Sequence, residues 1–153
     1  MDINVKKRDG ETEKFTADKI HKVLAWAVEG YKGVSAEEIE INARLNMRDG
    51  ISTDEIHQVV IETAANLISV EMPNYQYVAG RLLNYQLRKK VGGGKNPPRP
   101  LDLLKKNIDK GVYDAALLEK YTEEEVNKLG EMIDHDRDFI FTYAGIQQMC
   151  DKY

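Results

Sequence analysis

Residues 5–20 read Val-Lys-Lys-Arg-Asp-Gly-Glu-Thr-Glu-Lys-Phe-Thr-Ala-Asp-Lys-Ile. Asp9-Gly10 lies between two short extended runs and predicts a hairpin with a type I′ turn, because both central residues of that turn need positive φ. Thr16 can then cap a helix that we expect to begin near Ala17 and to carry Lys19 in its first turn. The stretch therefore predicts a basic hairpin that runs directly into a helix N-terminus.

Cations gather around this expected helix N-terminus, where the helix dipole disfavours them. An anion held among the N-terminus, Lys7, Arg8 and Lys19 would remove the conflict, since helix N-termini flanked by cations bind phosphate readily. Runs of charge are more often simply solvated faces. Spacing alone therefore leaves two interpretations open, a phosphate site and a plain basic hairpin beside an ordinary helix.

Composition limits the classes of protein to which the chain can belong. Its 153 residues, 42% of them hydrophobic, suffice for one domain of ordinary size or for a small domain with an attached segment. The net charge of -4 gives no overall basic field, so we expect no nucleic-acid partner. No apolar run approaches the ~18 residues of a membrane span, and the polar N-terminus is not typical of a signal peptide, so we expect no membrane partner.

Cys150 is the only cysteine. A single cysteine excludes an internal disulfide and any zinc site built from several cysteines, and it fits a reducing cytoplasm. It has no evident base nearby in the sequence, and Glu131 with His135 on one expected helix face does not amount to a metal site. We therefore expect no catalytic residue, no protein-held metal and a cytoplasmic location.

Apolar periodicity and capping residues predict four helices in the first ninety residues. The first covers 18–29 and ends at Gly30, and the second begins behind a capping box at Ser35–Glu38. A short third strand is expected at 44–48, where apolar and polar residues alternate. The sheet and the first two helices thus precede the strongest helical signal.

The strongest helix begins at a second capping box, Ser52–Glu55, and its apolar stripe covers 53–70 until Pro73 stops it. Its apolar face consists of Ile56, Val59, Val60, Thr63, Ala64, Leu67 and Ile68. The next helix is expected over 74–90, and its basic end, residues 88–90, suits the negative end of a helix dipole.

Residues 92–100 read Gly-Gly-Gly-Lys-Asn-Pro-Pro-Arg-Pro, a composition typical of a linker. They are not a phosphate loop, because Asn96 stands where the Walker pattern needs Ser or Thr after its lysine. Short amphipathic helices are expected beyond them, at 101–110, at 115–120 and, behind a third capping box at Thr122–Glu125, at 122–135. The expected division is therefore residues 1–91, a linker at 92–100 and a helical segment at 101–153.

The first part, roughly residues 3–91, resembles the ATP-cone, the small regulatory nucleotide-binding domain at the N-terminus of many ribonucleotide reductase large subunits. The matching motifs are Lys7-Arg-Asp-Gly10, Asp18-Lys-Ile20, Trp26-Ala-Val-Glu-Gly30, Thr53-Asp-Glu-Ile-His57, Tyr75-Gln-Tyr77 with Arg81, and Leu87-Arg-Lys-Lys90. The second part is similar to the segment that joins this cone to the catalytic barrel in aerobic class I enzymes. Its matching pieces are Gly111-Val-Tyr-Asp114, Leu117-Leu-Glu-Lys-Tyr121, Thr122-Glu-Glu-Glu125 and Ile133-Asp-His-Asp-Arg-Asp138.

The resemblance implies a mainly α fold with a small β-sheet, in which a three-stranded sheet lids a bundle of about four helices and a helical connecting segment follows. It implies an adenine nucleotide, ATP or dATP, under the lid, with Mg²⁺ carried on the phosphates rather than in a protein cage. Lys7, Arg8, Lys19 and Lys89 would contact mainly the phosphates. Val5 and Ile20 would sandwich the base, Glu13 would accept from the adenine amino group, and Thr16 stands where the family often has a base-contacting Asn. Thr53, Ile56 and His57 would line the sugar and phosphate side.

The function implied is allosteric control of overall reductase activity in deoxyribonucleotide synthesis, with ATP favouring the active enzyme and dATP an inhibited assembly. The implied partners are the remainder of the large subunit and the radical-generating small subunit. The catalytic cysteines, glutamate and radical-transfer tyrosines of the reductase core have no counterpart here, so we expect no reductase activity from this chain alone.

Two alternatives use the same motifs. The transcriptional repressor of reductase genes also carries an ATP-cone, but its zinc ribbon needs more than the single cysteine of this chain. A helical protein-interaction module that has lost nucleotide binding stays open, and calorimetry with ATP and dATP separates it from the regulatory module.

Overall fold

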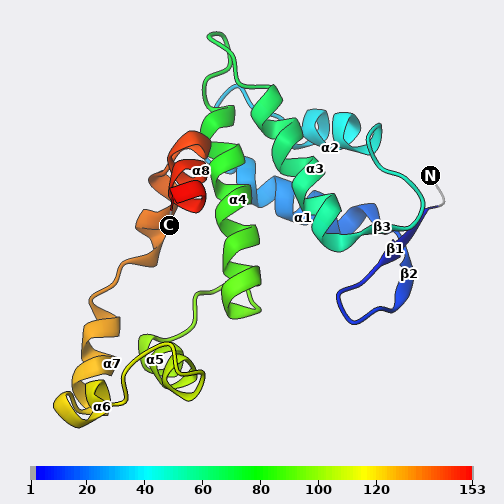
Figure 1. Cartoon of the computed structure of the whole chain (residues 1–153). Coiled ribbons are helices and arrows are strands. Elements are labelled where there is room, and N and C mark those ends of the chain that lie inside the picture. The colour runs from blue at the N-terminus through cyan, green and yellow to red at the C-terminus, as the bar shows by residue number, and fades with distance from the viewer. Residues whose placement is uncertain (1–2, 153) are drawn as a thin grey trace. The chain divides into compact units, whose positions relative to one another are not determined.

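The computed structural model describes residues 3–152 and consists mainly of helices with one small sheet (Figure 1). The strands β1 (Asn4–Lys6), β2 (Thr12–Lys14) and β3 (Ile51–Ser52) lie in the order β2-β1-β3, with β1 antiparallel to β2 and parallel to β3. The helices are α1 (Ala17–Val28), α2 (Ala36–Arg44), α3 (Thr53–Asn66), α4 (Tyr75–Gly92), α5 (Pro100–Asp109), α6 (Ala116–Lys120), α7 (Glu123–Glu131) and α8 (Tyr143–Lys152), with a 3₁₀ helix at His135–Ile140. The predicted class, mainly α with a small three-stranded sheet, is confirmed.

The chain divides into two compact units. The first holds the residues up to Gln86 together with those from Phe139 onward, and the second holds Leu87–Asp138. Helix α4 therefore gives most of its length to the first unit and its C-terminal residues to the second. The chain returns to the first unit within the 3₁₀ helix.

The hairpin between β1 and β2 is present, but its turn differs from the predicted one. Lys7 N–H donates to Glu11 O (2.8 Å) and Gly10 N–H donates to Lys7 O (3.1 Å). Gly10 has a φ of +89°, whereas Asp9 has a negative φ, so the type I′ prediction is wrong. A loop of this length lets a single glycine make the left-handed bend, and the Asp9 carboxylate supports it by accepting the Glu11 N–H (3.0 Å).

The third strand lies later in the chain than the sequence predicted. Leu45 continues the last turn of α2, with φ −64° and ψ −23°, so the strand expected at 44–48 is wrong. Asp49 explains where the strand forms instead, because its carboxylate accepts the Asn4 N–H (2.7 Å) while Gly50 N–H donates to Asn4 O (2.9 Å). These two bonds place β3 beside β1.

The predicted capping box of α3 is confirmed. Ser52 Oγ accepts the Glu55 N–H (3.2 Å), and the Glu55 carboxylate accepts the Ser52 N–H (2.8 Å). The helix ends at Asn66, several residues before the predicted end at 70. Ser69 Oγ accepts the Met72 N–H (3.1 Å) in the turn that follows, so a local side-chain bond replaces the last helical turn.

The predicted capping box of α2 is only half formed, because Tyr75 is inserted into it. Ser35 Oγ accepts the Glu38 N–H (3.1 Å), as expected. The Ser35 N–H, however, donates to the Tyr75 hydroxyl (3.0 Å), which in turn donates to the Glu38 carboxylate (2.6 Å). The Tyr75 ring is fully buried, and this relay ties α4 to the start of α2.

The core of the first unit lies among α1, α2, α3 and α4, which confirms the expected bundle of about four helices. Its largest fully buried side chains are Leu24, Ile39, Ile61, Tyr75 and Val78, which come from all four helices. The β1 residue Val5 is also buried and joins the sheet to this core.

Helix α8 belongs to the first unit and was not predicted. It approaches α4 closely at Gly80, where a Cβ atom would lie 2.5 Å from Phe141 O. Ile146 is its one buried residue, so its apolar stripe is too sparse to be recognised in the sequence. The packing of α8 against α4 therefore requires a residue without a Cβ atom at position 80.

The second unit contains α5, α6 and α7, close to the predicted ranges. The capping box at the start of α7 is confirmed, with Thr122 Oγ1 accepting the Glu125 N–H (3.2 Å) and the Glu125 carboxylate accepting the Thr122 N–H (2.8 Å). Helix α7 ends at Glu131, and His135 lies in the 3₁₀ helix. The prediction that Glu131 and His135 share one helix face is therefore wrong.

Candidate functional site

Two lysines of the first unit meet at one carboxylate. Glu13, on β2, directs one oxygen to Lys19 Nζ (2.7 Å) and the other to Lys7 Nζ (3.3 Å), and Lys7 also pairs with Glu11 (3.3 Å). Glu13 lies opposite the buried Val5 in the β1–β2 ladder, so both side chains project from the same face of the sheet. The sheet thus presents Glu13 toward the first turn of α1, where Lys19 lies.

These contacts change the proton affinities of the groups involved. The hydrogen bond from Lys19, followed by that from Lys7, lowers the pKa of Glu13. The hydrogen bond to Glu11, followed by that to Glu13, raises the pKa of Lys7. Both shifts favour the charged forms of Glu13 and Lys7 at neutral pH. Because solvent reaches these groups, each pair by itself contributes little to stability.

The N-terminus of α1 lies beside this cluster and is not capped by the Thr16 side chain, so the predicted cap is wrong. The Thr16 side chain is exposed, and its hydroxyl donates back to Lys14 O (3.4 Å) instead of accepting a helical N–H. Backbone N–H groups at such an end favour an anion. A phosphate group therefore fits the donor set formed by this helix end, Lys7 and Lys19.

Arg8 extends from the hairpin turn to the first turn of α3. Its Nε and Nη2 both donate to Asp54 Oδ1, at 3.0 and 2.6 Å. Asp54 follows Thr53, so the pair brings Arg8 to the helix end that carries the expected sugar-side residues. Sequence reasoning missed Asp54 and Glu11 as partners of the site cations, and no local pattern identifies the partner of Arg8, because the two residues are 46 positions apart.

The remaining predicted site residues of the first unit differ in exposure. Val5 and Ile56 are buried, with 5% and 6% of their surface exposed, whereas Ile20, Thr53 and His57 are half-buried. The His57 ring lies against the Tyr85 ring of α4, with 5.8 Å between centroids. The structure therefore brings Lys7, Glu13 and Lys19 into direct contact, and it places Val5 and Ile56 in the packed interior.

Lys89 is the one predicted site residue that lies in the second unit, near the C-terminal end of α4. Its neighbour Arg88 donates to His135 O (2.8 Å) and to the Asp138 carboxylate (2.7 Å) within the same unit. The basic end of α4 therefore does more than complement the helix dipole, because Arg88 fastens the 3₁₀ segment to α4.

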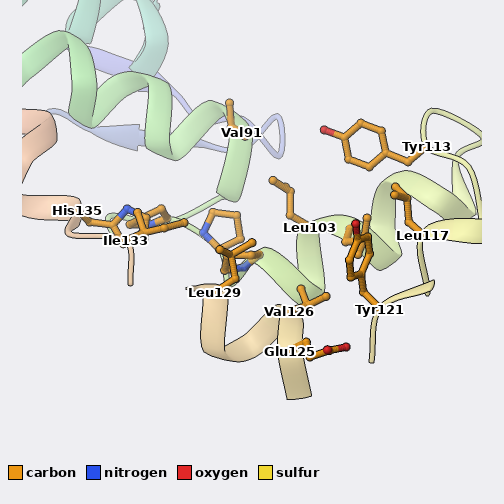
Figure 2. Close-up of a pocket in the computed structure, with 14 residues that line it drawn as sticks. Val91, Leu103, Tyr113, Leu117, Tyr121, Glu125, Val126, Leu129, Ile133 and His135 are labelled. Carbon is orange, nitrogen blue, oxygen red and sulfur yellow. The ribbon is translucent and has the colours of Figure 1, made fainter. Parts of the chain in front are cut away.

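An apolar pocket of about 620 Å³ lies within the second unit (Figure 2). Its walls include Val91, Leu103, Leu117, Leu129 and Ile133. The lining side chains with polar atoms are Tyr113, Tyr121, Glu125 and His135, and the Glu125 carboxylate is already bonded to Thr122. The surface of the pocket is nonetheless almost entirely apolar, so it lacks the converging polar groups that fix the orientation of a small-molecule substrate.

Residues 3–152, the described part of the chain, contain neither a metal-binding cluster nor a helix that could span a membrane. Within that range no group of three or more His, Cys, Asp or Glu side chains is placed to hold a metal ion. None of the helices in the described part of the chain is long and apolar enough to cross a bilayer.

Comparisons with known proteins agree with this geometry. Residues 3–90 match the family model described as "ATP cone domain". The chain is 48% identical over 153 residues to ribonucleoside-diphosphate reductase 1 subunit alpha of Escherichia coli. It is 46% identical over 149 residues to the protein of the same name in Salmonella typhimurium, and 46% identical over 151 residues to ribonucleoside-diphosphate reductase subunit alpha of Enterobacteria phage T4.

The matches cover 97% to 100% of this chain but only 20% of each relative, so the chain spans about a fifth of their length. The matched family range takes in the whole sheet and α1–α3, and it ends within α4. This chain belongs to the ATP-cone domain family, and its sequence corresponds to the N-terminal region of ribonucleoside-diphosphate reductase alpha subunits.

Proposed function

We propose that the chain is an allosteric module that binds ATP and dATP and thereby controls the activity of a ribonucleotide reductase. Family membership supports the broader role, regulatory nucleotide binding. The observation that carries the finer proposal is the junction of Lys7 and Lys19 at the N-terminus of α1. Two cations at a helix end without a side-chain cap form a suitable binding site for a polyphosphate.

Each site residue has a proposed task. Lys7, Arg8 and Lys19 neutralise the phosphates, and Lys89 adds a fourth cation by analogy with the family pattern. Glu13 accepts from the adenine amino group, and Val5, Thr16 and Ile20 line the base. Thr53, Ile56 and His57 line the sugar and the phosphates. Mg²⁺ would accompany the phosphates and neutralise part of their charge.

Glu13 must change partners for these tasks to be compatible. It holds Lys7 and Lys19 through its two oxygens. When phosphate oxygens take over the lysines, the Glu13 carboxylate becomes available as an acceptor for the adenine amino group. One carboxylate thus links phosphate binding to the recognition of adenine.

We propose that nucleotide binding changes a surface of the chain that contacts a partner protein. A ligand shifts an equilibrium only through its different affinity for two states, and ATP differs from dATP by one 2′-hydroxyl. Ile41 of α2 and Leu45, which follows its last residue, are exposed, at 63% and 76% of their surface. Helix α2 adjoins α3, whose first two turns carry Thr53 and His57. We propose that this face of α2 contacts the remainder of the large subunit or the radical-generating small subunit.

A helical interaction module without nucleotide binding is the competing function. It is favoured by one observation, that Lys7, Arg8 and Lys19 all have carboxylate partners in the structure. Isothermal titration calorimetry of the chain with ATP and with dATP decides between the two functions. Saturable binding of both nucleotides supports the regulatory module, and the lack of measurable heat with either supports the interaction module.

A further inference from the structure

The ion pair between Arg8 and Asp54 joins the hairpin turn to α3. Both guanidinium N–H groups point to the same carboxylate oxygen, at 3.0 and 2.6 Å. The two side chains remain 45% and 57% exposed, so a solute anion can reach the pair. Asp54 has no assigned part in the nucleotide site.

Asp54 is not needed to build α3. The helix is capped by the reciprocal bonds of Ser52 and Glu55, and Arg48 supports Glu55 further (3.0 Å). Asp54 is the second residue of the helix, where the dipole alone favours a carboxylate modestly. Its specific interaction in the structure is therefore the one with Arg8.

We propose that Asp54 competes with the nucleotide phosphates for Arg8 and so sets the affinity of the site. This inference rests on the proposed function, in which Arg8 binds phosphate. The Nε and Nη2 groups form the edge of arginine that grips carboxylate and phosphate oxygens alike. A phosphate that binds this edge must first displace Asp54. The net gain in binding free energy is therefore that of the new phosphate contact minus that of the lost contact with Asp54.

The competition also has a structural consequence. While Asp54 holds Arg8, the hairpin turn is tied to the first turn of α3. When phosphate takes Arg8, that tie is released. Asp54 therefore makes nucleotide binding and the side-chain link between hairpin and helix mutually exclusive, and it raises the nucleotide concentration at which the site fills.

Calorimetry on the full chain tests this inference with two ligands, ATP and inorganic tripolyphosphate. We expect Asp54→Asn to bind both ligands about two- to fivefold more tightly, the size of an exposed ion pair. Asp9→Asn is the matched control, because it removes the same charge from the hairpin turn while its amide oxygen can still accept the Glu11 N–H. We expect it to change affinity much less. Thermal melts of each variant by circular dichroism show that the fold is retained.

A double-mutant cycle with Arg8→Gln isolates the competition. In the Arg8→Gln background, Asp54→Asn should have no effect on either ligand. Equal tightening with and without Arg8, or equal tightening by Asp9→Asn, would show a general charge effect and overturn the inference. If the wild-type chain binds ATP and Asp54→Asn does not tighten it, the competition fails while the proposed function stands. If neither wild type nor Asp54→Asn binds ATP, both fail.

Discussion

At the scale of single residues, the cations of the candidate site are paired with carboxylates that solvent can reach. Glu13 shares its two oxygens between Lys7 and Lys19, and Asp54 pairs with Arg8, all with solvent access. Exposed pairs of this kind contribute little to folding. Each pair places a carboxylate beside a cation and so lowers the local net charge.

Replacing Lys7 or Lys19 by Ala should weaken ATP binding about tenfold or more, because each removes a charge-assisted contact to phosphate. Titration calorimetry of each single variant measures the loss. Lys32→Ala is the matched control, since this exposed lysine lies in the turn beyond the C-terminal end of α1. Unchanged ATP affinity in both Lys7→Ala and Lys19→Ala would refute the assigned phosphate contacts.

The Glu13 bridge should make stability depend on acid pH. Lys19, and then Lys7, hold the pKa of Glu13 below its ordinary value of 4.5. The stabilisation is therefore fully present above that ordinary value and is lost as pH falls through the depressed pKa. We expect wild type to melt at a slightly higher temperature than Glu13→Gln at neutral pH, with the difference shrinking as pH falls below 4.5 and through the depressed pKa of Glu13.

Thermal melts across this pH range measure the effect. Glu62→Gln is the control, because the Glu62 carboxylate accepts from the Gln58 amide rather than from a cation. A difference between wild type and Glu13→Gln that persists unchanged into strong acid would contradict the bridge.

At the scale of elements, short sequence motifs correctly predict the structures that are formed by bonds between residues close together in the chain. The Ser52–Glu55 and Thr122–Glu125 boxes are present because their partners lie three residues apart. The strand expected at 44–48 is wrong because β3 is positioned by Asp49 contacting Asn4, 45 residues away. Distant partners leave no periodic trace in the sequence.

The candidate site could be foreseen from the sequence only in part, for the same reason. The basic hairpin and the cations around the start of α1 are visible as a contiguous stretch, residues 5–20. Of their carboxylate partners, Glu13 lies within the same stretch, whereas Asp54 lies far away in the sequence, on α3. Tyr75 lies in the helix that was predicted over 74–90, but its hydroxyl relay to Ser35 and Glu38 depends on how α4 packs against α2.

Gly80 tests the packing of α8 on α4. A methyl group there would lie 2.5 Å from Phe141 O, so Gly80→Ala must displace the segment before α8. We expect a loss of about 1–3 kcal/mol in the free energy of unfolding, typical of overpacking. Urea denaturation measures it. Gly145→Ala, where the new Cβ atom meets Thr142 Oγ1 at an ordinary 3.4 Å, should leave stability nearly unchanged.

At the scale of the whole molecule, the 153 residues comprise an ATP-cone domain and a further helical segment. The chain spans about a fifth of the length of its relatives, and it contains one cysteine, whereas reduction of ribose through thiols needs several. We therefore expect no reduction of ribonucleotides by this chain alone. We propose that its regulatory output is a surface that changes when a nucleotide binds.

Hydrogen exchange with ATP and with dATP shows whether that surface responds. We expect protection of residues 35–57, which include α2 and the first turn of α3, to differ between the two nucleotides. A coupling of about 1–3 kcal/mol between sites suffices for regulation. Amides of α7 in the second unit serve as an internal reference. Identical protection of residues 35–57 with both nucleotides would refute a regulatory output through α2.

The central claim, that an adenine nucleotide binds where the hairpin meets α1, is tested most directly by an amide-resolved NMR titration of the chain with ATP. We expect saturable chemical-shift changes for the amides of residues 5–20 and 53–57, with the amides of α5 and α7 nearly unaffected. The second unit offers a natural comparison because its pocket is apolar and lies outside the cation cluster. Saturable shifts confined to that pocket, or no saturable shift at any amide, would contradict the account.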